Sequence, residues 1–154
     1  FVQAAAKNSV SLKRLIMPNP IGVMSNEKLL FYLIKTWSAE ETAFIRNPKL
    51  VRDNLPVDLL VQCVLLWLND DRELLEPSGY CASNESWINL VASQCRKRCH
   101  FPTKIVFNSK ENDKQLEEPA NLCNMENCFE LFPSWNEDLF WDELIEHLLD
   151  RVSD

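Results

Sequence analysis

Glycine is scarce in this sequence. Only two glycines, Gly22 and Gly79, occur among 154 residues. Glycine supplies the positive-φ turns of tight hairpins and allows the backbone to approach a bound phosphate closely. Two glycines are too few for the hairpins of a many-stranded sheet, and neither belongs to a Walker or Rossmann phosphate loop. The shortage therefore argues against a β-rich fold and against the common nucleotide chemistries.

Histidine is equally scarce, with only His100 and His147. Neither belongs to a His-Glu-x-x-His metal motif, and no serine has the flanking residues of a nucleophile elbow. Adjacent carboxylates such as those of Asp70 and Asp71 are typical of a solvated surface unless burial separates their pKa values. Without a nucleophile paired with a base, we predict that the chain is not an enzyme.

Long apolar runs are also missing. The most apolar stretch, residues 59–68, spans about ten residues and is interrupted by Gln62. A membrane span needs about twenty residues, so the stretch fits a buried core helix and we expect no membrane partner. No signal peptide is visible, and the chain begins at Phe1, so we expect a fragment of a larger protein.

Positive charge is in the minority, because 16 Lys and Arg face 23 Asp and Glu, for a net charge of −7. An acidic surface repels nucleic acid over most of its area. A local basic patch is nevertheless conceivable. This leaves one alternative function, an accessory helical domain of a nucleic-acid-processing protein that contacts RNA or DNA through a set of basic residues: Arg96, Lys97, Arg98 and Lys104, together with Lys13 and Arg14.

The remaining composition is that of one ordinary globular domain, with 46% hydrophobic and 25% charged residues. Apolar periodicity, proline positions and Ser-x-x-Glu capping boxes at Ser38 and Ser134 predict the helices. We expect them over residues 2–17, 26–37, 39–47, 57–68, 84–99 and 137–152. Residues 100–133 are expected to be irregular, with one short strand near 104–107. The sequence thus predicts an all-α domain over residues 1–154, a compact helical bundle or short helical array.

Two cysteine pairs are the nearest approach to a chemical site. Cys95 and Cys99 form one pair and Cys123 and Cys128 the other, with spacings that tetrahedral zinc sites use. Zinc would hold the weakly apolar segment between them, and His100 could replace one thiolate. Three interpretations stay open: one structural zinc, disulfides between the two pairs, or thiols in a helical core with no cofactor at all.

The cysteines also bear on the compartment. A domain of this size does not need disulfides, so we expect an intracellular protein of the cytoplasm or nucleus. The alternative is a secreted, disulfide-bearing domain, which an Asn-x-Ser acceptor at Asn84 would suit.

An aromatic segment completes the candidates. Phe129, Phe132, Trp135 and Trp141 lie close together in the sequence and have the make-up of interface anchors. They either pack across their own core or bind a partner's groove, together with the acidic face of the last helix. The function that the sequence favours is a non-catalytic scaffold or adaptor domain that binds another protein.

Overall fold

The computed structural model describes residues 12–23, 28–108 and 121–153. Helices take 47% and strands 25% of these residues, and several of the sheets are parallel, so the fold is mixed α/β. The predicted all-α class is wrong. Most of the helix predicted over residues 2–17 lies outside the described residues, and its end forms a strand instead.

Five helices occur in the described part of the chain: α2 (Lys28–Ser38), α3 (Val57–Leu68), α4 (Asn84–Arg98), α5 (Cys128–Leu131) and α6 (Glu137–Ser153). The strands are short. They are β1 (Arg14–Leu15), β2 (Asn19–Ile21), β3 (Thr42–Arg46), β4 (Val51–Pro56), β5 (Leu74–Leu75), β6 (Pro77–Ser78), β7 (Tyr80–Ser83), β8 (Lys104–Asn108) and β9 (Glu126–Asn127).

The sheets explain why the glycine argument failed. Strands β2, β4 and β7 form one sheet, and β1–β5, β3–β8 and β6–β9 form two-stranded pairs. Only β4 and β7 are antiparallel; every other pairing between these strands is parallel. Parallel strands are joined by long crossovers rather than tight hairpins, so they need no glycine turns. A shortage of glycine therefore argues against tight hairpins but does not argue against strands.

Strand β3 replaces the helix predicted after Ser38. The preceding helix α2 ends there: the Glu41 N–H donates to the Thr36 carbonyl, and Glu40 takes the left-handed conformation with φ 58°. This is the Schellman arrangement, with glutamate where glycine is usual. Beyond it, side chains alternate inward and outward, as a strand requires, with Ala43 and Ile45 buried.

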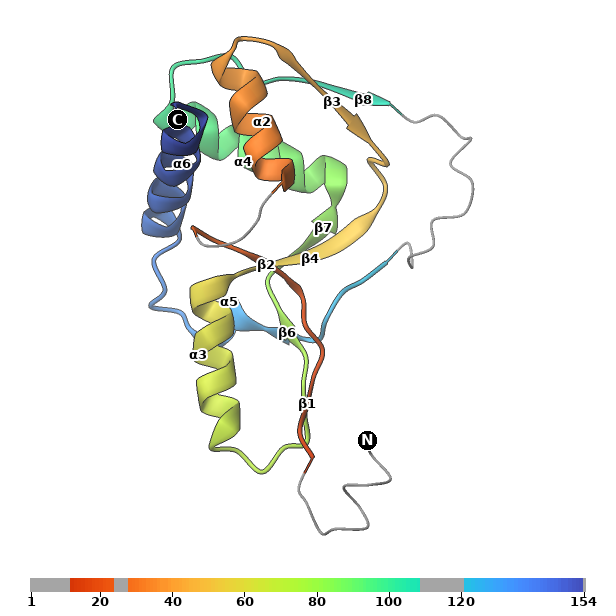
Figure 1. Cartoon of the computed structure of the whole chain (residues 1–154). Helices are drawn as coiled ribbons and strands as arrows, with labels where there is room; N and C mark the ends of the chain where they lie inside the picture. The colour runs from red at the N-terminus through yellow and green to blue at the C-terminus, as the bar shows by residue number, and fades with distance from the viewer. Residues whose placement is uncertain (1–11, 24–27, 109–120, 154) are drawn as a thin grey trace.

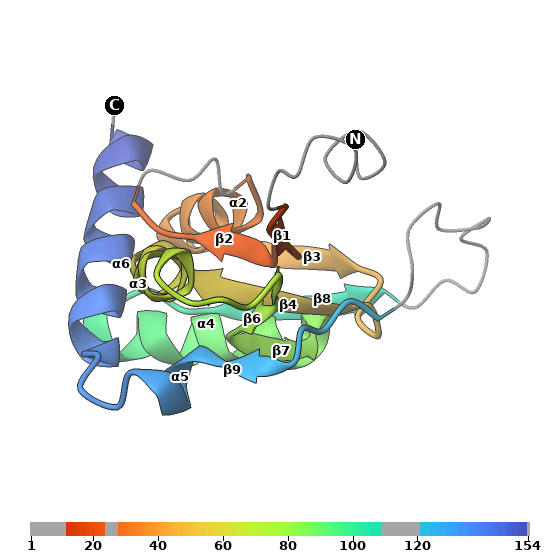
Figure 2. The ribbon, with the colours of Figure 1, turned by 90° about the horizontal axis from the view of Figure 1, so that it is seen from below.

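The molecule has two hydrophobic cores. The upper core in Figure 1 lies among α2, α4, α6 and β3, and the lower core lies between α3, α5 and β5, with the β2–β4–β7 sheet between the two regions. Figure 2 shows α6 standing along one side of the molecule, beside the ends of α2 and α4. The predicted amphipathic pattern of α6 is confirmed by burial of its apolar side chains, which are Phe140, Trp141, Leu144, Ile145 and Leu148.

The helix caps agree only in part with the sequence. Ser83 caps α4, because its hydroxyl accepts a hydrogen bond from the Ser86 N–H. At α6 the Asn136 side chain accepts from the Leu139 N–H, so the cap lies two residues after the predicted Ser134. Within the described residues, every helix is too short or too polar to span a membrane.

Candidate functional site

The four cysteines of the zinc hypothesis do not lie together. Cys95 is buried in the upper core on α4, and Cys99 is half-buried at the end of that helix. Cys123 forms a disulfide with Cys81, and Cys128 is buried in the lower core. In the described segments no three His, Cys, Asp or Glu side chains are grouped to hold a metal ion.

The disulfide differs from the pairing considered from sequence, because Cys123 bonds to Cys81 rather than to Cys95 or Cys99. It joins β7 to the segment that precedes β9. A disulfide of this kind persists in an oxidising environment. The compartment of the protein, intracellular or secreted, stays a prediction.

A second cysteine pair lies in the lower core. The Sγ atoms of Cys63 on α3 and Cys128 on α5 are 3.0 Å apart, and both side chains are buried. The hydrogen bond between the thiols lowers the pKa of Cys63 and raises that of Cys128. Burial raises the pKa of the Cys95 thiol to about 12 and also raises that of Cys99. A thiol with so high a pKa stays protonated at neutral pH and is a poor nucleophile.

The aromatic segment mostly packs inside the protein. Trp141 is completely buried, and Phe129, Phe132 and Trp135 are half-buried. Ring contacts run from Trp87 through Tyr80 and Phe129 to Trp135, with centroids 4.8–5.5 Å apart. These rings join the upper core to the lower one, which is the internal role considered from sequence. Their role in binding a partner stays a prediction.

Tyr80 is the polar member of this aromatic group. Its hydroxyl donates to the Glu137 carboxylate at 2.7 Å, and the Trp141 indole N–H donates to the same oxygen at 3.3 Å. Burial, followed by the adjacent carboxylate, raises the pKa of Tyr80. The phenol therefore stays protonated and acts as a structural donor rather than as a base.

The basic residues of the nucleic-acid hypothesis are partly occupied. Arg98, whose side chain is 14% exposed, pairs with Asp138 and Asp142 on α6. The Lys13 ammonium donates to carbonyls at the end of α3 and lies over the Trp67 ring. Three further cations of this hypothesis are exposed, namely Arg96, Lys97 and Lys104. Nucleic-acid binding stays a prediction.

A cavity of about 380 Å³ lies beside β2 and β4. We call it the Arg52 pocket. Its walls combine apolar side chains with amide and guanidinium groups from segments far apart in the sequence: Ile16, Met17, Pro18, Asn19, Arg52, Asp53, Leu122 and Asn124. A guanidinium binds phosphate and carboxylate oxygens; here Arg52 also donates to the Val51 carbonyl, and the Asn19 and Asn124 amides donate to acceptors within the protein.

Asp53 forms the floor of the Arg52 pocket and is 3% exposed. Its carboxylate accepts the Gly79 N–H at 2.7 Å through one oxygen and the Asn124 N–H at 2.9 Å through the other. The Asn124 amide in turn donates to the carbonyls of Ile16 and Pro77. Asp53 therefore orders the wall of the pocket, and backbone N–H groups already bind both of its oxygens.

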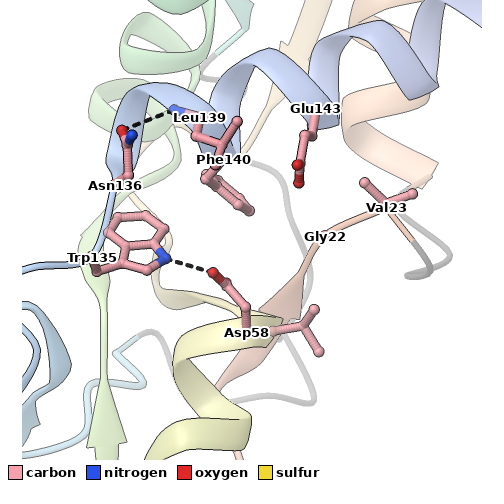
Figure 3. A pocket seen from close by; sticks show the side chains of 9 residues that line it. Gly22, Val23, Asp58, Trp135, Asn136, Leu139, Phe140 and Glu143 are labelled. Carbon is pink, nitrogen blue, oxygen red and sulfur yellow. Dashed lines mark hydrogen bonds between the residues drawn. The ribbon is translucent and has the colours of Figure 1, made fainter.

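A second pocket, of about 250 Å³, lies between the start of α3 and the start of α6. Figure 3 shows Asp58 and Glu143 on facing sides of it, with the Trp135 indole N–H donating to Asp58 at 2.5 Å. Its remaining walls are mostly apolar, from Gly22, Val23, Val57, Leu139 and Phe140 together with Asn136. Two exposed carboxylates repel an anion, so the two pockets suit opposite kinds of ligand.

Sequence reasoning did not single out the Arg52 pocket. One signal was present in the sequence: Arg52, Asp53 and Asn54 are three consecutive polar residues shortly before the most apolar helix. Asp53 and Asn54 are buried in the structure. Buried polar side chains need hydrogen-bond partners, and here those partners come from residues 19, 79 and 124. Nothing local in the sequence indicates such distant partners.

No protein-family model matches the chain, and no curated protein matches it. Solved structures do match. One is the UDP-N-acetylglucosamine 4-epimerase of Methanobrevibacter ruminantium M1 in complex with UDP-N-acetylmuramic acid, with a TM-score of 0.60 and 13% identity. Another is the L-threonine 3-dehydrogenase of Trypanosoma brucei, with a TM-score of 0.58 and 10% identity.

These similarities cover 99% and 97% of this chain but only 50% and 49% of the two enzymes, so the chain spans about half the length of either. At such low identity the likeness establishes the fold alone. Because both neighbours are enzymes, the comparisons give no support to the prediction that the chain lacks enzymatic activity.

Proposed function

We propose that this chain is the substrate-binding part of an epimerase- or dehydrogenase-like protein, and that the Arg52 pocket binds an anionic, nucleotide-linked metabolite. The observation that carries the proposal is the chemistry of the pocket. Its lining combines the Arg52 guanidinium with apolar side chains, and its one carboxylate already accepts two backbone N–H groups.

The similar structures support this choice of ligand. The epimerase was solved with UDP-N-acetylmuramic acid, an anionic nucleotide-linked sugar. A guanidinium binds such diphosphates well, because its planar N–H groups match two oxygens at once. The apolar lining from Ile16, Met17 and Leu122 suits the base or the sugar face.

The proposal also divides the chemistry between two parts of a protein. This sequence contains no glycine-rich phosphate loop, so a dinucleotide, where the complete protein uses one, is held outside these residues. On this view the chain binds and orients a substrate, and the groups that react with it come in part from elsewhere.

Thermal unfolding with added ligand tests the proposal. UDP-N-acetylglucosamine should raise the melting temperature, by mass action, whereas N-acetylglucosamine alone should not. Arg52→Ala should abolish the shift. Arg46→Ala is the matched control, because Arg46 is an exposed arginine on β3 that does not line the pocket. The same shift in Arg52→Ala as in the unmodified chain would contradict the assignment.

The scaffold or adaptor function stays a second proposal, with the aromatic segment and the acidic face of α6 as its contact surface.

A further inference from the structure

Helix α3 is apolar on the side that faces away from its own core as well as on the side that faces inward. Its twelve residues include only two polar ones, Asp58 and Gln62. Leu59, Leu60, Cys63 and Trp67 are buried in the lower core. Five further apolar side chains are between 37% and 59% exposed, and we call them the α3 outer face: Val57, Val61, Leu65, Leu66 and Leu68.

The α3 outer face is continuous rather than scattered. Residues 57, 61, 65 and 68 follow one another at intervals of four, four and three, so they form a stripe along the whole helix. A helix in contact with water normally carries charges on its outer side, and a helix that is apolar all round is normally covered. The sequence predicted that α3 is a buried helix, but the described residues bury only one side of it.

The strand pair beside α3 is also incomplete. Strands β1 and β5 pair in parallel over two residues each, and in the described part of the chain neither pairs with a further strand. Leu15 and Leu75 of this pair pack against the α3 side of the lower core. Parallel sheets are found almost only where further strands and helices cover them, so a lone pair of this kind is typical of the edge of a larger sheet.

Exposed apolar residues continue around β1. Leu12, Ile16 and Met17 are 43%, 38% and 58% exposed and flank this strand in the sequence. The α3 outer face and the β1–β5 pair could therefore be buried by one and the same unit. Such a unit has to supply a strand parallel to the pair and an apolar surface against α3.

The length of the similar enzymes indicates what that cover is. This chain matches 50% and 49% of the two chains, so in each of them about as much polypeptide again accompanies the shared fold. A second copy of this chain fits less well. Each copy carries a net charge of −7, and strands related by a two-fold axis meet antiparallel, which does not extend a parallel sheet.

We propose that the α3 outer face and the β1–β5 edge form the docking surface for a second α/β domain of the same polypeptide, about as long as this chain. The domain continues the parallel sheet from the β1–β5 edge and packs an apolar surface against the stripe on α3. This proposal rests on the assignment of the chain as one half of an epimerase- or dehydrogenase-like protein.

Photo-crosslinking in the complete protein tests the docking surface. Leu65 is replaced by p-benzoylphenylalanine in the protein expressed from its complete reading frame, and the crosslinked peptides are mapped by mass spectrometry. The control site is Phe44, which is 59% exposed on β3 in the other half of the molecule. We expect Leu65→p-benzoylphenylalanine to crosslink within one chain to peptides outside residues 1–154, and the Phe44 variant not to reach those peptides.

Other outcomes overturn the proposal. A crosslink between two copies of this chain would make the α3 outer face a dimer interface. A crosslink confined to residues 1–154, no crosslink at Leu65, or a reading frame that encodes no further folded domain would each contradict it. The result is separate from ligand binding: Arg52→Ala should leave the Leu65 crosslink unchanged, so loss of the ligand response alone would refute only the pocket.

Discussion

Replacing the buried Asp53 tests how the wall of the Arg52 pocket is held. Its carboxylate accepts the Gly79 and Asn124 N–H groups at 2.7 and 2.9 Å. A hydrogen bond to a charged group contributes about 1.5–3 kcal/mol net, and a buried N–H left without an acceptor costs a similar amount. Asp53→Ala leaves both N–H groups without this acceptor, so it should lower the free energy of unfolding by about 3–6 kcal/mol.

The free energy of unfolding of Asp53→Asn should lie between that of Asp53→Ala and that of the unmodified chain. The asparagine oxygen can accept one of the two bonds, while its NH₂ group meets the other N–H donor. We therefore expect a loss of about 1.5–3 kcal/mol, or half that of the alanine variant. Urea unfolding followed by tryptophan fluorescence measures both values.

Asp71→Asn is the matched control, because Asp71 is an exposed carboxylate on the surface turn after α3. Its replacement should change stability by less than about 0.5 kcal/mol. The reasoning is refuted if Asp53→Ala loses less than about 1 kcal/mol, or if the asparagine and alanine variants are equally stable.

Further predictions concern the disulfide, Gly79 and Cys95. Cys123→Ser opens a bond to Cys81 across a sequence separation of 42 residues, which should lower stability by about 4 kcal/mol under oxidising conditions; adding reductant to the unmodified chain should reproduce the loss. Gly79→Ala places a Cβ 2.5 Å from the backbone oxygen of Asn54, so it should cost about 1–3 kcal/mol in chemical unfolding, and an unchanged midpoint would contradict this packing. Burial raises the pKa of Cys95 from 9.0 to about 12, so iodoacetamide at pH 8 should label this thiol only after unfolding. Since the folded chain retains this proton longer than the unfolded chain, the contribution of Cys95 to stability should fall as the pH rises from 9 to 12, which pH-dependent unfolding would reveal.

The long helices were predictable because their signals are local. The sequence predicts helices over residues 26–37, 57–68, 84–99 and 137–152, and the structure has Lys28–Ser38, Val57–Leu68, Asn84–Arg98 and Glu137–Ser153. The strand expected near 104–107 is β8 (Lys104–Asn108). Apolar spacing, prolines and caps act over a few residues, and these elements depend on nothing further away.

The remaining strands were missed because their partners are distant. Thr42 of β3 pairs with Lys104 of β8, and Asn19 of β2 pairs with Asn54 of β4. Each of these strands is short, and its stability comes from the partner and the core rather than from its own composition. The same reason hid the Arg52 pocket, whose walls come from residues 16–19, 52–53, 122 and 124.

The cysteine hypothesis shows the limit of spacing as evidence. Cys95 and Cys99 are four residues apart on one helix. That interval is compatible with a metal site, with a disulfide and with core packing, so it does not distinguish the three interpretations. In the structure Cys95 and Cys99 belong to the upper core and Cys128 to the lower one, while Cys123 is bonded to Cys81. Spacing alone did not reveal that Cys81 and Cys63 would be the neighbours of Cys123 and Cys128.

The segment over residues 121–131 determines when the lower core can finish folding during synthesis. Four of its attachments to the rest of the molecule span 42, 54, 65 and 71 residues of sequence, and their partners are Cys81, Arg72, Cys63 and Asp53. All four partners leave the ribosome before the segment does. Until it arrives, a buried carboxylate and a core thiol lack their partners, so a nascent chain paused before residue 121 exposes a lower core that cannot yet close.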